Sequence, residues 1–187
     1  MENKEKLRNQ ISDSAGNVLY SFSAHWNIVN RLKKEYFWIK IVQIGLVALS
    51  TAGIIATISQ GVSWLSWLSG LCSAGALFLN LYMLNFNPAE EIKKHTDAAN
   101  ELWDVREEFK SLDVDFDDLS IAEIRNKRDK LNEKIGEINK KYPGTDEKSF
   151  TKAQKEINKY QFTEGESEKL LNIDRKVMEG GQGEVHE

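Results

Sequence analysis

One uncharged stretch decides the fold of this chain. Residues 41–89 have the sequence IVQIGLVALSTAGIIATISQGVSWLSWLSGLCSAGALFLNLYMLNFNPA and contain no Asp, Glu, Lys, Arg or His. A hydrocarbon layer roughly 30 Å thick is crossed by about 20 helical residues, so the stretch is long enough to cross it twice. It predicts one span over 41–58 and a second over 64–86, joined by a short polar turn that contains Gly61. The expected structure is a membrane hairpin whose two flanks lie on the same side.

The charges beside this stretch indicate which side that is. The turn carries no charge, whereas basic residues precede the first span and follow the second: Arg31, Lys33, Lys34, Lys40, Lys93 and Lys94. Because positively charged flanks stay in the cytoplasm, both termini are predicted to be cytoplasmic. The alternative is a buried helical hairpin inside a soluble domain, but the rest of the chain is too short and too polar to cover it.

The composition excludes several classes of protein. The chain has 187 residues and a net charge of −4, and its acidic excess lies in the second half. That distribution argues against a nucleic-acid partner, whose phosphates need clustered Lys and Arg. The single cysteine, Cys72, lies in the second span, so a disulfide framework or a cysteine zinc site within one chain is excluded. No cleavable signal peptide is expected, since the first apolar run follows a long polar segment.

We predict an all-α membrane protein, in which a two-helix transmembrane hairpin joins an N-terminal amphipathic helix to a C-terminal cytoplasmic helical bundle. The expected parts are the N-terminal helix in 1–36, the hairpin in 37–87, the cytoplasmic helical region in 88–178 and a disordered tail in 179–187. Apolar residues of the first helix recur every three or four positions and form one face: Leu7, Ile11, Ala15, Val18, Phe22, Trp26 and Val29. This face packs either in the protein's own bundle or on lipid headgroups. Basic residues are not concentrated opposite it, which favours the bundle.

Local signals place the helices that follow the hairpin. Asn87-Pro88 breaks the chain and opens a helix that reaches about Leu112. The pattern Ser120-Ile-Ala-Glu123 is a capping box, and the helix it opens stops at Pro143-Gly144. A further helix is expected over 147–160, with Phe150, Ala153, Ile157 and Tyr160 on its apolar face, and a weak last one through Val177.

An acidic cluster separates two of these helices and consists of Asp113, Asp115, Asp117 and Asp118. Spaced aspartates suggest a calcium loop, but the glycine at the sixth position and the bidentate Glu at the twelfth are missing. The cluster is therefore predicted to be a solvated acidic linker.

Polar side chains form a stripe on each predicted span. In the first span they stand seven residues apart, and in the second they alternate steps of three and four with Ala76; they are Gln43, Ser50 and Thr57, then Ser66, Ser69, Ser73 and Asn80. One interpretation is that several hairpins assemble with these stripes facing a common, water-accessible axis. The other is close helix packing with hydrogen bonds across the interface, which is the commoner role of a single membrane Ser or Thr. Gln43 and Asn80 are the stronger candidates for a pore or an oligomer contact, because amides are costlier to bury without partners.

No enzymatic site is predicted. His25 and His95 are the only histidines outside the tail, and neither has a metal-ligand spacing or a recognisable nucleophile nearby. Each is better explained as a packing or interface residue. No glycine-rich phosphate loop is present either, so no cofactor is expected.

Several short motifs occur in a set order around the hairpin: Trp38-Ile-Lys40, Leu79-Asn-Leu-Tyr82, Lys94-His95, Ala99-Asn-Glu-Leu-Trp-Asp-Val-Arg106, Ile124-Arg-Asn-Lys-Arg-Asp129, Tyr142-Pro143 and Lys152-Ala-Gln-Lys155. With these motifs the chain resembles the SLATT family of two-transmembrane effectors, which are associated with SMODS nucleotidyltransferases and SLOG nucleotide-sensing domains. The resemblance extends from about Leu7 to Lys176.

The resemblance implies a bacterial or archaeal conflict-system effector of the inner membrane that perturbs the bilayer when activated. A nucleotide-signal synthase or a sensor protein encoded nearby would supply the trigger, and the chain would form a homo-oligomer. His95, Trp103 and Arg106 match the family's post-membrane motif and are expected to fix the cytoplasmic helix against the bundle. An alternative is a membrane-anchored scaffold that recruits a cytoplasmic partner. A third alternative is a hydrolase or nuclease with an unrecognised site, but no residue pattern in the sequence supports it.

Overall fold

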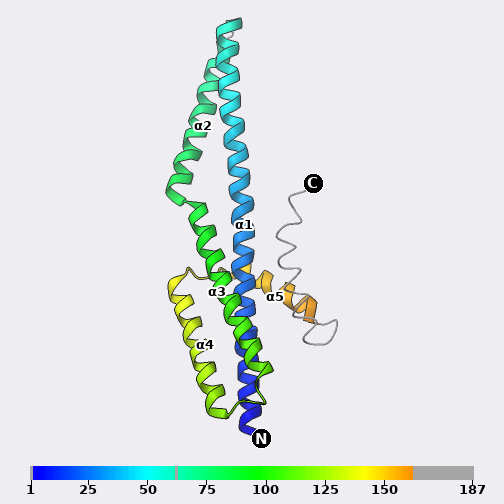
Figure 1. Ribbon diagram of the computed structural model, residues 1–187. Coiled ribbons are helices and arrows are strands. Elements are labelled where there is room, and N and C mark those ends of the chain that lie inside the picture. Colours follow the sequence, from blue (N-terminus) through cyan, green and yellow to red (C-terminus); the bar gives the residue numbers. More distant parts are fainter. Residues whose placement is uncertain (1, 62, 162–187) are drawn as a thin grey trace. The chain divides into compact units, whose positions relative to one another are not determined.

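The computed structural model describes residues 2–61 and 63–161, and five helices lie within this part of the chain (Figure 1). They are α1 (Glu2–Gln60), α2 (Trp64–Phe86), α3 (Pro88–Val114), α4 (Ile121–Lys141) and α5 (Glu147–Gln161). No strand occurs in the described residues, so the all-α class is confirmed. The predicted last helix through Val177 and the predicted tail lie outside these residues, and so does the side chain of Tyr160.

The contacts divide the chain into two compact units. Within the described residues, one unit, here called the bundle, holds residues 2–30 and 93–161. The other, here called the hairpin, holds Arg31–Ile92. Helix α1 contributes to both units without a break, because no proline occurs before Pro88 and the glycines within it remain helical.

Local backbone chemistry ends the two helices of the hairpin. Helix α1 stops at Gly61, whose φ of 67° lies in the left-handed region that glycine adopts without strain. Helix α2 stops at Asn87, which also has a positive φ, and its amide donates to the Met83 carbonyl. Pro88 then begins α3, where its missing N–H removes no helical hydrogen bond. The break predicted at Asn87-Pro88 is therefore confirmed.

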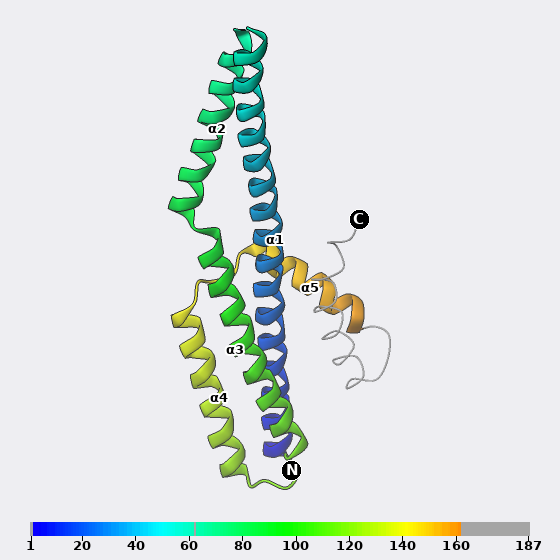
Figure 2. The same cartoon turned by 45° about the horizontal axis from the view of Figure 1, so that its top comes forward.

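The bundle has one apolar core, to which α1, α3, α4 and α5 all contribute. Phe22, Phe109 and Phe116 are its largest fully buried side chains. Figure 2 shows α3 and α4 side by side, with α5 lying across the bundle. Burial of each such aromatic side chain contributes roughly 1.5–3 kcal/mol. The other buried members of the core are Leu7, Ile11, Val18, Leu19, Ala99, Leu102, Val105, Leu112, Ile124, Leu131, Ile138 and Ile157.

The capping box at the start of α4 is confirmed. The Ser120 hydroxyl accepts a hydrogen bond from the Glu123 amide, and the Ser120 amide donates to the Glu123 carboxylate. Hydrogen bonds from Ser120 lower the pKa of the Glu123 carboxyl. At its other end α4 is tied to α3, because Lys141 and Tyr142 both donate to the Glu101 carboxylate.

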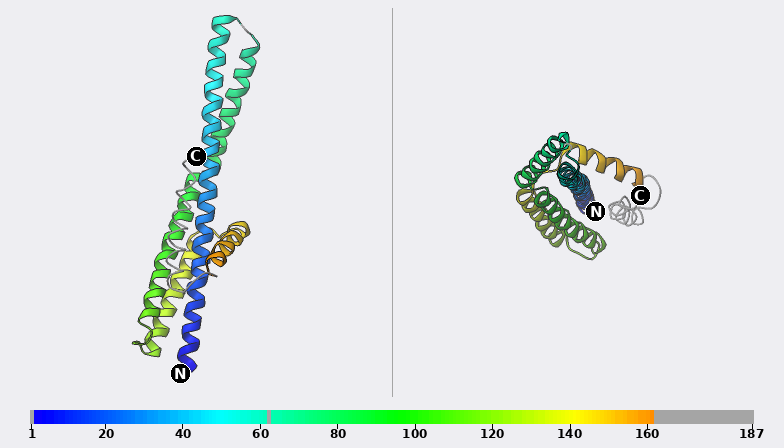
Figure 3. Two further views of the ribbon diagram at one scale, coloured as in Figure 1. Left: turned by 90° about the vertical axis from the view of Figure 1, so that its right-hand side faces the viewer. Right: turned by 90° about the horizontal axis from the view of Figure 1, so that it is seen from above.

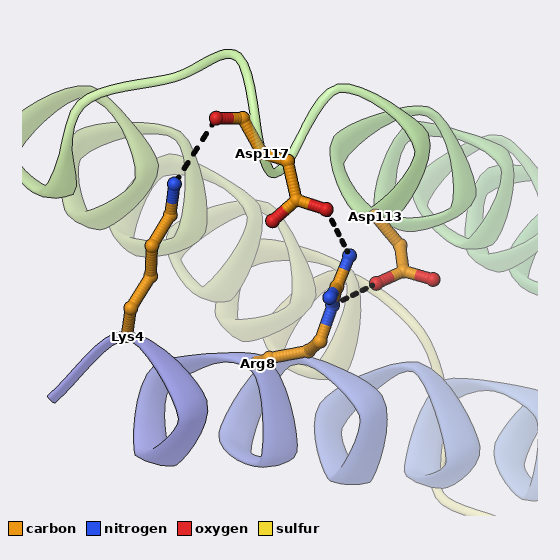
Figure 4. A network of polar contacts seen from close by, with 4 residues as sticks. All are labelled: Lys4, Arg8, Asp113 and Asp117. Atoms are coloured by element: carbon orange, nitrogen blue, oxygen red, sulfur yellow. Dashed lines mark hydrogen bonds and ion pairs between the residues drawn. The ribbon is translucent and has the colours of Figure 1, made fainter. Parts of the chain in front are cut away.

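The acidic linker is exposed, but two of its aspartates bind the start of α1 (Figure 4). Arg8 lies 3.2 Å from the Asp113 carboxylate and 3.5 Å from that of Asp117, and Lys4 donates to the Asp117 carbonyl. The Arg8 guanidinium also lies 4.6 Å from the ring centroid of Phe116, which is buried. The linker is therefore solvent-exposed, as predicted, and one apolar residue within it also anchors it to the core.

Candidate functional site

The hairpin exposes a large apolar surface. Its two helical stretches contain 18-residue windows of mean hydropathy 2.1 and 1.4, of which only 6% and 17% is buried. A core helix of a soluble protein would be mostly buried, so lipid is the environment that this surface matches. The most exposed side chains include Ile44, Leu49, Ile55, Ile58, Trp64, Trp67, Leu71, Phe78 and Leu84.

The two helices of the hairpin run side by side, as the ribbon in the left view of Figure 3 shows, and they pack through a narrow set of residues. Less exposed residues recur at steps of three and four on each helix, which is the spacing of a helix pair. At Gly53 an added Cβ would overlap the Ser69 hydroxyl, so the backbones approach closely there. We call these residues the hairpin seam: Gln43, Leu46, Ser50, Gly53 and Thr57 on α1, with Leu65, Ser69, Cys72, Ala76, Leu79 and Met83 on α2.

Among the described residues of the hairpin, three hydrogen bonds cross between its two helices. The Gln43 amide nitrogen donates to Asn80 Oδ1 at 2.7 Å. Near the middle of the hairpin the Ser50 hydroxyl donates to the Ser69 carbonyl at 3.0 Å. Close to the turn, the Ser66 hydroxyl donates to Thr57 Oγ1 at 3.3 Å. The polar stripes of the two spans thus face each other within one chain.

The second stripe does not lie wholly inside the seam. Ser69 is buried, whereas Ser66, Ser73 and Asn80 are exposed along one flank of α2. A groove of about 310 Å³ opens along this side of the hairpin. Five hydroxyl-bearing residues line it, together with Ile54, Ile58 and Gly70; they are Ser50, Thr57, Ser66, Ser69 and Ser73. Hydroxyl groups in this position are able to bind water or the polar groups of another helix.

In the bundle, the predicted post-membrane residues lie on the inner face of α3. His95 is buried, and its Nδ1 lies 2.8 Å from Nδ1 of His25, which is also buried. Burial, followed by the neighbouring His95, lowers the pKa of His25 to about 4. At neutral pH the His25 ring is therefore neutral, and one N–H lies between the two Nδ1 atoms.

Arg106 and Trp103 lie further along α3. The Arg106 side chain is buried, donates to Glu107 at 3.0 Å and lies 5.0 Å from the Trp103 ring centroid. Trp103 in turn packs 5.2 Å from the ring of Phe22 on α1. The contact between Trp103 and Phe22 joins α3 to α1, whereas the two contacts of Arg106 lie within α3.

A family model described as SMODS and SLOG-associating 2TM effector domain family 4 matches residues 7–167 of the chain. The chain belongs to this family. Comparisons with curated proteins and with solved structures find no match. Membership in a two-transmembrane effector family agrees with the exposed apolar surface of the hairpin, so this SLATT chain is a membrane protein. Its family assigns it to the membrane effectors of conflict systems.

Sequence reasoning did not find every polar contact of this SLATT chain. It treated His25 and His95 as separate packing residues. Each histidine lies on a buried helix face, however: His25 with Phe22 and Val29 on α1, and His95 with Ala98 and Leu102 on α3. Their spacing from these apolar residues was the available signal. Asn27 was also missed; its amide donates to the Ser149 carbonyl and to Glu156, which fastens α5 to α1. Among the described residues, no group of three or more His, Cys, Asp or Glu is placed to hold a metal ion.

Proposed function

We propose that this chain is an inner-membrane effector whose hairpins assemble and, on activation, open a path through the bilayer. Both termini lie in the cytoplasm in this proposal. The observation that carries it is the set of three cross-helix hydrogen bonds, through which the polar groups of one span meet those of the other.

The energies suit a switch. A hydrogen bond between membrane helices contributes about 0.6 kcal/mol on average and at most about 1.7 kcal/mol. Three such bonds therefore favour the closed hairpin by roughly 2–5 kcal/mol. Coupling between a ligand site and a distant element is typically about 1–3 kcal/mol, which is of the same order. An activator that binds the open packing more tightly can therefore shift the population.

Assembly is proposed to use the exposed flank of α2. Ser66, Ser73 and Asn80 stand seven residues apart there, so they form one line along the helix. Hydroxyl and amide groups both donate and accept hydrogen bonds, so the same line on a second copy is a complementary surface. When α1 and α2 rotate or separate, Gln43, Ser50 and Thr57 would join this line and face water.

The trigger is proposed to come from outside the chain, from a nucleotide-signal synthase or a sensor protein. The family description supports this proposal, because its name refers to association with SMODS and SLOG. The bundle would receive the signal, and α1 provides a continuous helical connection from the bundle to the first span.

Release of dye and ions from liposomes tests the proposal. Gln43→Leu with Asn80→Leu removes one hydrogen bond of the closed packing and also the two amides that would line the open path. We expect this variant to insert and fold but to release less than the wild type, because the open path loses its polar lining. The matched control is Thr51→Val with Asn85→Leu. These two exposed side chains lie in the same spans but bond carbonyls of their own helices, Val47 and Leu81. The control is expected to behave as the wild type.

Two outcomes would contradict this mechanism. Equal release by the amide-pair variant and the wild type would show that the polar stripes do not take part in opening the path. Tight liposomes under every condition, with the protein inserted and folded, would favour a membrane-anchored scaffold. In that case an unrelated two-span anchor in place of residues 37–87 should preserve function in cells.

A further inference from the structure

A second groove lies in the bundle, between α3 and α4. It has a volume of about 390 Å³, and Leu112 and Leu131 contribute apolar side chains to its lining. On the α4 side it is lined by Lys127, Lys130 and Lys134, which recur at steps of three and four and so share one face of the helix. The groove combines apolar side chains with a row of cations.

The surrounding charges make this groove basic within an acidic chain. Helix α4 carries seven Lys and Arg against four Asp and Glu, whereas the whole chain has a net charge of −4. Further along the same face, the cations already have partners. Lys134 contacts both oxygens of Glu108, at 2.6 and 2.7 Å, and Lys141 contacts Glu101.

The other two lysines of the groove are different. Neither Lys127 nor Lys130 forms an ion pair with any residue in the described part of the chain. The carboxylate that Lys127 influences, Glu123, is already held by the capping box. The carboxylate of Glu107, which also lines the groove, is bound by Arg106 and Lys110. The ammonium groups of Lys127 and Lys130, which lie one helical turn apart, are therefore available to bind an anion.

We propose that the α3–α4 groove binds a phosphate-bearing small molecule of the nucleotide class. Its phosphate accepts hydrogen bonds from Lys127 and Lys130, and its ring lies along the aliphatic stems of the groove's lysines, above the buried Leu112 and Leu131. Lys binds phosphate as a compact charge with three donors, so two lysines suffice to bracket one phosphate group. The binding site stands independently of what the hairpin does. Its role as a trigger rests on the proposed function.

Isothermal titration calorimetry on the full chain in phosphatidylcholine nanodiscs tests the site, with AMP and inorganic pyrophosphate as probes. We expect AMP to bind at low ionic strength, and binding to weaken as salt is added. Lys127→Gln with Lys130→Gln should weaken AMP binding by roughly tenfold or more. The matched control, Lys140→Gln with Lys148→Gln, removes the same charge from exposed positions of α4 and α5 outside the groove and should bind as the wild type.

Three results would overturn the site. They are no heat with either probe, equal affinity in the Lys127/Lys130 variant, and equal loss in the control. Nanodiscs that contain phosphatidylglycerol separate a soluble ligand from a lipid headgroup. If the lipid competes with AMP in the wild type, the groove holds a headgroup and the assignment to a soluble ligand is wrong.

Dye release distinguishes failure of the site from failure of the proposed function. Binding that depends on the two lysines supports the site even when AMP or pyrophosphate leaves release unchanged. Release that responds to AMP in the wild type but not in the Lys127/Lys130 variant would support both.

Discussion

Acidification from about pH 7 to about pH 5 is expected to destabilise the bundle through His25. This ring is buried and lies 2.8 Å from His95, and its pKa falls from 6.5 to about 4 on folding. Below pH 6.5 the unfolded chain therefore takes up a proton that the folded chain does not yet bind. The unfolded state binds more protons, so stability falls as the pH falls. The loss begins near pH 6.5 and is complete near pH 4.

The two pKa values set the size of the effect. Linkage from 6.5 to about 4 for one group gives a loss of about 2 kcal/mol by pH 5 and about 3 kcal/mol by pH 4. A loss of about 2 kcal/mol lowers Tm by several degrees.

The assay is thermal unfolding of the full chain in detergent micelles, followed by tryptophan fluorescence between about pH 7.5 and pH 4. Trp26 and Trp103 report on the bundle, because both pack against its core. The comparison variant carries His25→Gln with His95→Gln, which places an amide pair where the imidazoles were. Carboxylates titrate in both proteins, so the difference between the two pH profiles isolates the histidine pair. The variant should have the flatter profile below pH 6.5. Parallel profiles would refute the assignment of this pH dependence to His25.

Three further predictions concern other parts of the molecule. Gly53→Leu should force the hairpin helices apart and destabilise the hairpin by about 1–3 kcal/mol. Gly45→Leu is the control and should not destabilise it, because the space around the Gly45 Cβ position is open. Equal stability of the two variants in detergent would contradict the close approach of the helices at Gly53. Ser120→Ala removes the cap of α4 and should lower the unfolding free energy by about 1 kcal/mol, and an unchanged denaturant midpoint would show that the capping box contributes nothing. In a cysteine-free background, Ser63→Cys should react with a membrane-impermeant maleimide added outside the cell and Asn139→Cys should not; the reverse pattern would invert the proposed topology.

Much of the fold follows from local sequence signals. The uncharged run and its turn place two apolar helices, and the Asn87-Pro88 break and the capping box at Ser120 set boundaries that the structure reproduces. Each of these features depends on residues a few positions apart, through backbone hydrogen bonds, proline geometry or hydrophobic periodicity. Such interactions are present in the sequence whatever the rest of the chain does.

The candidate site was predicted only in part. Sequence periodicity identified polar stripes on both spans but did not show that Gln43 meets Asn80 or that Ser50 meets the Ser69 carbonyl. These contacts depend on the register of two antiparallel helices, which is set by side chains that interlock along the whole seam. The small size of Gly53 is part of that register, because it allows the Ser69 hydroxyl to approach the α1 backbone.

The sequence by itself determined that this protein is all-helical, that two of its segments match a bilayer, and that it belongs to a two-transmembrane effector family. Apolar length, charge placement and motif order carry that information, and none of them requires knowledge of which residues touch. Only the tertiary structure decided that His25 pairs with His95 and that Phe116 anchors the acidic linker. It also decided that Lys127 and Lys130 face a groove without carboxylate partners in the described chain. The partners of a polar or apolar side chain are chosen by packing between distant segments, and helix propensity and hydrophobic patterning do not specify that choice.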